Sequence, residues 1–415
     1  MYLGIDFGTS GVRAIAINSQ KIIVAEMRTS YDLTDIQTWK LALEAVIKQI
    51  PQKIRQGLKA IAIDGTSSTV LICSSLGQPI CPPLLYNDGR GSEVLEDLRA
   101  IAPMSNITIS STSSLAKLLW LVENLGLNLE NQEHYFLHQA DWLAYLLHGN
   151  LGISDYHNAL KLGYDPQNLQ YPDWLRNSKI RNLLPKVFRP GSAIAPIQPE
   201  IAARLEINPD CLICAGTTDS TASFIASGAN TVGDAVTALG STLVLKILSQ
   251  NPVENSKYGV YSHRLGDLWL VGGASNTGGA VLKQFFTDIE LERLSLEMLN
   301  RPHPQPDLNY YPLPKIGERF PINDPKIQPR MEPRPESDHE FLYGLLDGIA
   351  KIEGDGYSLL QKLGVSAPCR IYTTGGGAKN PLWTKIRQTY LDAEIVQPDQ
   401  TEAAYGSAIL ALSTD

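Results

Sequence analysis

Two aspartates in this chain stand where a carboxylate could act on a phosphate or a hydroxyl group. Asp6 precedes the turn 8–11 in "IDFGTSGVRAIAI", and Asp219 follows a strand-like run in "CLICAGTTDS". Exposed N–H groups, hydroxyls and closely approachable glycines at such a turn suit an anion. Phosphoryl transfer to an alcohol needs a metal ion and a carboxylate that receives the hydroxyl proton. We therefore expect Asp219 to act as general base and Asp6 to serve Mg2+, directly or through water.

Glycine-rich turns follow apolar strand-like runs at three places, residues 8–11, 240–242 and 375–377. A glycine turn at a strand end or helix N-terminus suits a phosphate group. None of the three has the Gly-Lys-Ser/Thr of a Walker loop, and "GGGAKN" is not the dinucleotide fingerprint. Together they favour a nucleotide held between two domains.

Each of these residues also has a purely structural interpretation. The turn 8–11 is equally typical of an ordinary hairpin tip, and an aspartate such as Asp219 commonly caps a helix. Asp64, Asp88 and Asp234 are weaker candidates, and for Asp64 and Asp234 we expect surface turns.

The elements around Asp6 indicate an α/β layer domain. Alternating apolar residues on both sides of the turn 8–11 predict a β-hairpin, and "QKIIVAEMR" predicts a third strand. "LKAIAIDGTSSTVLIC" predicts a return to strand after a helix. One face of that helix carries Trp39, Leu43, Val46 and Ile50.

An internal repeat is the most informative feature of the organisation. "AVTALGSTLVLKIL" again runs strand, Gly-Ser-Thr turn, strand, like the opening hairpin, and a helix is expected from about Ser220. At 415 residues the chain is expected to form two domains. We place the first at 1–226, joined by the C-terminal helix 398–415, and the second at 227–397.

The remaining segments are less regular. We expect residues 100–210 to be mainly helical. Residues 301–335 hold ten of the 26 prolines, which predicts an extended excursion without regular helix. Beyond it, "CRIYTTGGGAKNPLWTKIRQ" predicts strand, glycine turn and helix.

Composition narrows the class of protein. Charged residues make up 19% and hydrophobic residues 43%, with a net charge of −8, and no basic run or apolar stretch of about 20 residues stands out. We therefore expect neither nucleic acid nor a membrane as a partner. A first strand beginning at residue 2 leaves no room for a targeting segment, and five cysteines favour a reducing compartment. These features predict a cytoplasmic protein, either monomer or homodimer.

Two other constellations carry less weight. Cys211 and Cys214 lie three apart in a buried strand, where they point to opposite faces, so a redox pair is disfavoured. His134 and His138 lie four apart in a run with helical periodicity and could share a metal, but a plain helix surface is favoured.

Several motifs together resemble the FGGY carbohydrate kinases, within the superfamily of sugar kinases, actin and chaperone ATPases. They are "DFGTSGVRA", "LLYNDGR", "SSLAKLLWLVENLG", "AGTTDS", "ALGST", "GGASNTGG", "YYPLPKIGERFPINDP" and "TGGGAKN", in that order along nearly the whole chain. The resemblance implies two actin-like, ribonuclease H-like α/β domains that close on ATP and a sugar.

The resemblance also implies roles for individual residues. Asp219 would be the general base, and Asp6 and Asp219 would serve both metal and substrate. Ser67, Asn87 and Asp88 would face the sugar. The residues implied for ATP are Thr9, Ser10, Gly11, Gly240, Ser241, Thr242, Gly375, Gly376, Gly377, Asn380 and Trp383. For Trp383, core packing is the alternative.

Departures from the family pattern guide the substrate expectation. The chain is shorter than typical members, "DGTSST" stands where many xylulokinases carry Met-His-Gly, and Tyr86 replaces a frequent Trp. These features resemble the plant and cyanobacterial xylulokinase-like subgroup associated with D-ribulose. We expect an ATP-dependent kinase that makes D-ribulose 5-phosphate. D-xylulose or a polyol as acceptor, and a non-catalytic switch like the actin and chaperone branches, are the alternatives.

Overall fold

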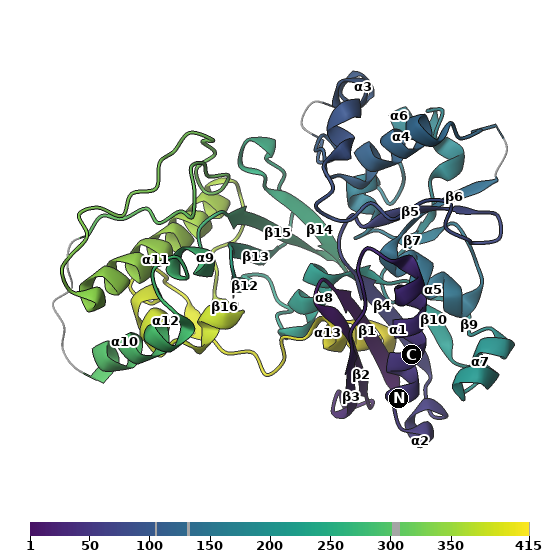
Figure 1. Ribbon diagram of the computed structural model, residues 1–415, viewed down its shortest axis with the longest axis horizontal. Coiled ribbons are helices and arrows are strands. Elements are labelled where there is room, and N and C mark those ends of the chain that lie inside the picture. Colours follow the sequence, from purple (N-terminus) through teal and green to yellow (C-terminus); the bar gives the residue numbers. More distant parts are fainter. Residues whose placement is uncertain (104–105, 131–132, 301–307, 415) are drawn as a thin grey trace. The chain divides into compact units, whose positions relative to one another are not determined.

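The computed structural model describes residues 1–103, 106–130, 133–300 and 308–414. The chain divides into two compact units (Figure 1): unit 1 comprises Met1–Ala226 and Gln400–Asp415, and unit 2 comprises Ser227–Asp399. Among the described helices, none has the length and apolar character needed to cross a membrane.

Unit 1 is built on a mixed sheet with strand order β3-β2-β1-β4-β10-β9, with β11 paired to β4. The predicted opening hairpin is confirmed, because β1 pairs antiparallel with β2 and closes at Gly8 and Gly11. The strands are β1 (Tyr2–Gly8), β2 (Gly11–Ile17), β3 (Ile23–Thr29), β4 (Ala60–Gly65), β9 (Ala193–Pro196), β10 (Leu212–Cys214) and β11 (Thr217–Thr218).

Helices cover both faces of this sheet. On one face, Leu3, Ile5 and Trp39 belong to a buried apolar cluster, formed with α1 (Ile36–Gln49), α5 (Gln139–His148) and α7 (Pro199–Leu205). On the other face, α13 (Ala403–Leu412) packs on β1 and β4 and against α8 (Asp219–Ala226) (Figure 1). Gly406 makes the close helix approach possible, since a Cβ there would lie 1.9 Å from the Ala222 carbonyl oxygen.

A smaller apolar cluster of unit 1 lies under β5 (Val70–Ser74), β6 (His134–His138), α3 (Leu95–Ile101) and α4 (Ser114–Leu125). α4 begins at a regular cap, where the Ser113 hydroxyl accepts from the amide of Ala116. The other short elements of unit 1 are α2 (Gln52–Arg55), α6 (Asp173–Arg176), β7 (Ile153–Asp155) and β8 (Lys186–Phe188).

The prediction that 100–210 is mainly helical was wrong, because four strands and several irregular segments lie there. The expected helix through His134 and His138 is a strand, β6, and helix α5 begins only at Gln139. The physical reason is the aromatic run Tyr135–Phe136, which favours a strand and pairs in register with β5.

Unit 2 contains a six-stranded sheet with order β14-β15-β13-β12-β16-β17. Its strands are β12 (Asp234–Leu239), β13 (Leu243–Ser249), β14 (Tyr261–Leu265), β15 (Leu268–Ser275), β16 (Arg370–Thr374) and β17 (Glu394–Val396). One apolar core joins the sheet to α9 (Gly279–Leu282), α10 (Asp288–Asn300), α11 (Asp338–Lys362) and α12 (Pro381–Arg387). The proline-rich segment has no regular helix over its described part, 308–335, and its first residues, 301–307, lie outside the described residues.

The internal repeat predicted from the hairpins is confirmed by the strand pairing. In unit 1, β1 pairs antiparallel with β2, β2 antiparallel with β3, and β1 parallel with β4. In unit 2, β12, β13, β15 and β16 repeat the same relations in the same places. Both units therefore present a hairpin turn beside the end of a parallel central strand.

A buried ion pair joins the sheet of unit 2 to its helices. Arg387 on α12 donates to both carboxylate oxygens of Glu353 on α11, at 2.6 and 2.8 Å, and to the Thr373 hydroxyl at 2.9 Å. The Thr237 hydroxyl on β12 donates to Glu353 at 2.6 Å. Because Arg387 is 0% exposed, its charge depends on these partners.

Candidate active site and nucleotide pocket

Three acidic side chains of unit 1 gather at one end of its sheet. Asp6 on β1 lies directly opposite Asp64 on β4, and Thr217 on β11 lies opposite Asp64 on its other side. Side chains at paired positions of neighbouring parallel strands point to the same face. The expectation of a surface turn for Asp64 was wrong: its side chain is 0% exposed, because β4 is a central strand covered on both faces.

The two carboxyl groups of Asp6 and Asp64 share one environment. Burial raises the pKa of Asp6, and the charge of Asp219 adds to that effect. Burial also raises the pKa of Asp64, and the neighbouring Asp6 raises it further. Ionisation of two neighbouring carboxyl groups together is disfavoured, because their negative charges repel. A proton held by Asp64 can therefore form a hydrogen bond to Asp6.

Asp64 is additionally held from the C-terminal helix. The Ser407 hydroxyl on α13 donates to Asp64 Oδ2 at 2.5 Å, and both residues are fully buried. Asp6 Oδ1 and Asp64 Oδ1 are buried without a hydrogen-bond donor among the described residues. Such orphaned carboxylate oxygens fit a hard cation or a proton.

Asp219 is the first residue of α8 and follows β11 directly. Its Oδ1 accepts from the amide of Ser220 at 2.6 Å, and the side chain is only half-buried. The three carboxyl groups lie close enough to interact electrostatically, since the charge of Asp219 raises the pKa values of Asp6 and Asp64. The structure therefore brings together Asp6 and Asp219, which the sequence had singled out.

The carboxylate oxygens of Asp6 and Asp219 are of the ligand type that Mg2+ prefers. Over the described ranges, no group of three or more His, Cys, Asp or Glu side chains has the geometry of a complete metal site. Mg2+ usually takes one or two protein carboxylates and completes its shell with water and substrate phosphates. Asp6, with its orphaned oxygen, is the residue best suited to that partial role.

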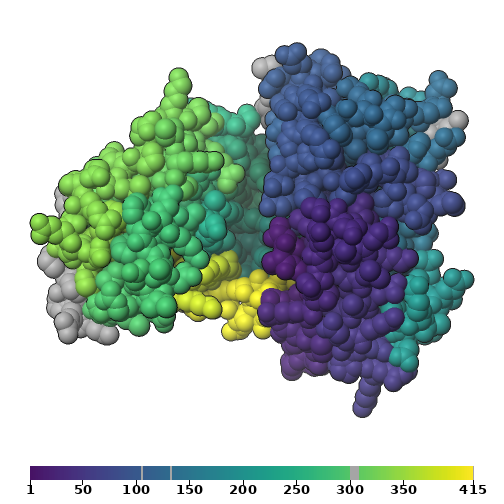
Figure 2. Space-filling view, in the orientation of Figure 1, coloured from purple at the N-terminus to yellow at the C-terminus, as the bar shows by residue number. Residues whose placement is uncertain are grey.

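The turn Thr9–Ser10 is exposed and is tied to the rest of unit 1 through Gly8. The Tyr31 hydroxyl donates to the Gly8 carbonyl at 2.8 Å and accepts from Gln139 Nε2 at 3.3 Å. Gln139 Oε1 in turn accepts from the amide and hydroxyl of Thr66 at 3.0 Å. In Figure 2 the purple surface of the N-terminal region adjoins the blue surface of the segments that follow it in unit 1.

The predicted sugar residues come from two neighbouring segments of unit 1. Ser67 follows β4, and Asn87 and Asp88 follow the bridge between Val70 and Leu84. Asn87 is exposed and Ser67 half-buried. The Asp88 carboxylate is engaged by Arg90, whose guanidinium donates at 2.6 to 3.1 Å and lowers the pKa of Asp88.

In unit 2, three glycine-containing segments pack against one another. The turn 240–242 accepts hydrogen bonds from the amides of Gly279 and Ala280, at 2.8 and 3.1 Å. Gly375 has a φ of 83°, and a Cβ there would lie 2.6 Å from the Leu239 carbonyl oxygen. The predicted turns 240–242 and 375–377 are therefore brought together within one unit.

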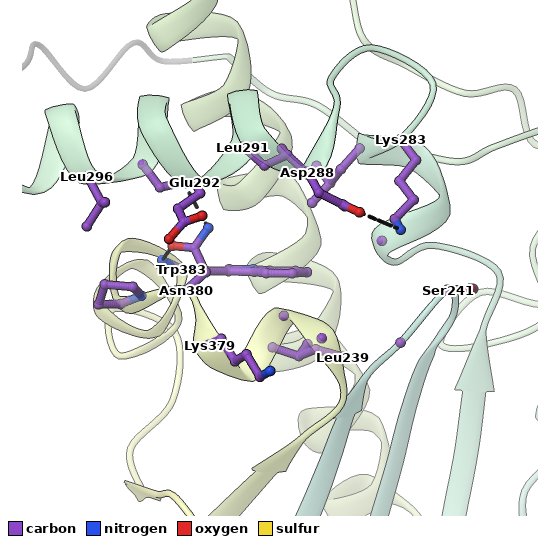
Figure 3. A pocket seen from close by; sticks show the side chains of 17 residues that line it. Leu239, Ser241, Lys283, Asp288, Leu291, Glu292, Leu296, Lys379, Asn380 and Trp383 are labelled. Atoms are coloured by element: carbon purple, nitrogen blue, oxygen red, sulfur yellow. Dashed lines mark hydrogen bonds and ion pairs between the residues drawn. The ribbon is translucent and has the colours of Figure 1, made fainter.

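A pocket of about 660 Å³ opens beside these turns (Figure 3). Its lining includes Gly240, Ser241, Gly376, Gly377, Asn380 and Trp383, all of them expected for ATP, together with charged side chains at Lys283, Asp288, Glu292 and Lys379. Gly11, Thr9 and Ser10, expected for the same ligand, belong to unit 1. Thr242 and Gly375 belong to the turns 240–242 and 375–377 but are not among the residues that line the pocket.

Trp383 and Asn380 are held tightly at the start of α12. Asn380 caps the helix by accepting from the Trp383 amide at 3.1 Å, and its Nδ2 donates to the Ser295 hydroxyl at 2.8 Å. The Trp383 side chain is 2% exposed and belongs to the apolar core, and its ring lies between Leu291 and Leu239 in Figure 3. Trp383 thus both packs in the core and lines the pocket.

Two residues of the site in unit 1, Ser407 and Gln139, were not predicted from the sequence, and Asp64 was predicted only as a weaker candidate. All three act through strand register or long-range contacts that no local spacing reveals. Asp234, expected at a surface turn, is buried and pairs with Arg370 at 2.9 Å. A usable signal existed only for Asp64, since "AIAIDG" repeats the strand-end aspartate of "LGIDFG".

Comparisons with known proteins agree with this architecture. Residues 1–226 match the FGGY family of carbohydrate kinases, N-terminal domain, and residues 235–414 match its C-terminal domain. The chain is 23% identical to a xylulose kinase of Staphylococcus epidermidis, over 99% of this chain and 87% of that protein. It is 23% identical to a gluconokinase of Bacillus subtilis, over 99% of this chain and 86% of that protein.

Among solved structures, a ligand-bound xylulose kinase from Lactobacillus acidophilus superimposes with a TM-score of 0.84. The two chains are 20% identical, and the match covers 99% of this chain and 89% of the other. The expected fold of two actin-like α/β domains is confirmed. Because its two matched domains together span nearly all of its length, this chain belongs to the FGGY family of carbohydrate kinases.

Proposed function

We propose that this chain phosphorylates a ketopentose with ATP and that D-ribulose is its preferred acceptor, giving D-ribulose 5-phosphate. The observation that carries the proposal is the carboxylate cluster of Asp6, Asp64 and Asp219 at the sheet end of unit 1. Family membership supplies the reaction type.

Asp219 is the proposed general base. It stands at a strand-to-helix junction and is half-buried, so its carboxylate can reach an incoming hydroxyl while keeping the Ser220 hydrogen bond. A positioned base of this kind contributes about 10²–10⁴-fold in rate.

Asp6 is the proposed metal-serving residue. A Mg2+ ion held there would neutralise charge on the transferring phosphate. Thr9, Ser10 and Gly11 would present hydroxyl and amide groups to the same phosphate. Asp64, which bonds to Asp6 and accepts from Ser407, would fix the orientation of the Asp6 carboxylate.

The pocket of unit 2 is the proposed ATP site. Its glycines at 240, 376 and 377 leave room for backbone contact with a ligand, and Ser241 is exposed at the turn. Its volume of about 660 Å³ is in the range of small-molecule sites. Phosphoryl transfer then requires the γ-phosphate of this ATP to reach the acceptor bound by unit 1.

The choice of D-ribulose as acceptor is based on the sequence of the segments that carry Ser67, Asn87 and Asp88. "DGTSST" offers hydroxyl groups where many xylulokinases carry Met-His-Gly, and Tyr86 replaces a frequent Trp. Relatives named xylulose kinase and gluconokinase keep D-xylulose and other polyols as the competing acceptors. D-ribulose and D-xylulose differ in the configuration of one hydroxyl, which a hydrogen-bonding site can distinguish strongly.

The test is sugar-dependent release of ADP with ATP and Mg2+, measured across D-ribulose, D-xylulose, gluconate and glycerol under one set of conditions. We expect the highest kcat/KM for D-ribulose and a pentulose monophosphate as product. A higher kcat/KM for another acceptor would overturn the substrate assignment. No sugar-dependent ADP release with any acceptor would overturn the kinase assignment.

A further inference from the structure

Lys117 on α4 is a buried cation that the proposed reaction does not use. Its side chain is 0% exposed, although it lies in the amphipathic run "SSLAKLLWLVENLG". The ammonium donates to the carbonyl oxygens of Ser68 and Leu85, at 2.8 and 2.6 Å. Burying an ammonium group costs free energy, and these two hydrogen bonds offset part of that cost.

Charges of both signs act on the Lys117 ammonium. Burial lowers the pKa of Lys117 to about 7. Asp88 favours the charged form, whereas Lys161 and Arg90 oppose it. Since Asp88 is already paired with Arg90, the principal partners of the Lys117 ammonium are the two backbone carbonyls.

Both carbonyls belong to the segments proposed to bind the acceptor. Ser68 directly follows Ser67, and Leu85 precedes Asn87 by two residues. The Tyr86 amide adds a second link, donating at 3.0 Å to the hydroxyl of Thr69 in the first segment. Lys117 therefore joins the two segments at their bases.

Ser68 also has an unusual backbone. Its φ is 64°, in the left-handed region that favours glycine and that is sterically unfavourable for a serine. Its hydroxyl accepts from Ser114 at 3.2 Å, and Ser114 lies 3.0 Å from His138 Nε2. Such conformations persist where the surroundings over-determine them, and they cluster at ligand-binding sites.

We propose that Lys117 is a positioning residue that fixes the segments Ser67–Ser68 and Leu85–Asp88 relative to one another and thereby sets the affinity for the sugar. This inference rests on the proposed function. Lys117 itself touches no substrate: it acts through the two carbonyls, and Ser114, one turn earlier on α4, contacts the hydroxyl of the same Ser68.

Arg55 provides a matched control for a role in stability alone. It is also a buried cation of unit 1, and it donates to two carbonyl oxygens, those of Lys48 and Ile50, at 2.8 and 2.7 Å. It also pairs with Glu206. Its contacts join α1 to α2, which carry none of the proposed sugar residues.

The experiment compares Lys117→Met with Arg55→Met in the full chain. Measured for both are the thermal midpoint, kcat, the KM for ATP and the KM for the acceptor that the wild type uses best. For Lys117→Met we expect the sugar KM to rise about tenfold or more, with kcat and the ATP KM changed by less than about threefold. For Arg55→Met we expect a lower thermal midpoint and an unchanged sugar KM.

Equal effects of the two variants on the sugar KM would overturn the inference and leave Lys117 as a structural residue. A wild type that phosphorylates no sugar would instead overturn the proposed function. If Lys117→Met does not fold, Lys117→Gln decides the question, because its shorter, neutral side chain keeps a hydrogen-bond donor in place of the ammonium that bonds to both carbonyls. We expect Lys117→Gln to fold with a sugar KM raised about threefold or more and with little change in kcat; an unchanged sugar KM would overturn the inference.

Discussion

The two units share the same strand pairing but carry side chains of different chemical character at equivalent positions. Asp6 stands two residues before Gly8 and pairs with Asp64, whereas Ala238 stands two residues before Gly240 and pairs with Thr374. Unit 1 therefore carries a carboxyl pair where unit 2 carries small neutral side chains. The glycine turns of unit 2 border a pocket instead.

The neighbouring positions show the reverse distribution. In unit 1, Ile5 pairs with Ile63 in an apolar core, whereas in unit 2 Thr237 pairs with Thr373. These two threonines bond to the buried pair of Glu353 and Arg387. Unit 1 thus gathers carboxyl groups at the end of its sheet, and unit 2 buries an ion pair that holds helices against its sheet.

The largest effect should come from breaking the buried pair of unit 2. Arg387→Met leaves the Glu353 charge without its cation, and we expect a loss of about 3–5 kcal/mol in the free energy of unfolding. The control is Arg293→Met, whose pair with Glu297 on α10 is exposed to solvent and therefore contributes little to stability. Urea unfolding of both variants checks this, and equal losses would contradict a structural role for the buried pair.

The next effect should come from the carboxyl pair of unit 1. Asp6→Asn keeps the side-chain shape but removes the charge that we propose serves Mg2+, and we expect kcat to fall by about a hundredfold. Ala238→Ser changes the equivalent position of unit 2 and should leave kcat unaltered. An unchanged kcat and an unchanged Mg2+ dependence in Asp6→Asn would show that Asp6 has only a structural task.

A smaller effect should mark the pocket of unit 2. A Cβ at Gly376 meets no described atom within 4 Å, so Gly376→Ala should not change the thermal midpoint. If ATP lies against this glycine, the added methyl group raises the KM for ATP by about tenfold. The control is Ala378→Gly, which tests the effect of loop flexibility in the same turn. Gly364→Ala would be unsuitable, because alanine is strained at the φ of 101° that Gly364 adopts. An unchanged ATP KM in Gly376→Ala would place the nucleotide elsewhere.

The sequence predicts the hairpins because apolar alternation and glycine turns are local signals. Lys117 could not be recognised in this way, since a lysine within an amphipathic helix is usually exposed. Asp64 was misplaced because its burial depends on which strands flank β4. His134 and His138 were assigned to a helix because a segment of only five residues fits both the helical and the strand periodicity until its pairing with β5 is known.

The assignment of catalysis to unit 1 and of ATP binding to unit 2 is tested most directly by Asp219→Asn, with sugar turnover and ATP affinity measured on the same preparation. The account predicts that sugar phosphorylation falls by about 10²–10⁴-fold, while the Kd for ATP changes by less than about threefold. Sugar turnover close to that of the wild type, or a loss of ATP affinity as large as the loss of turnover, would contradict it.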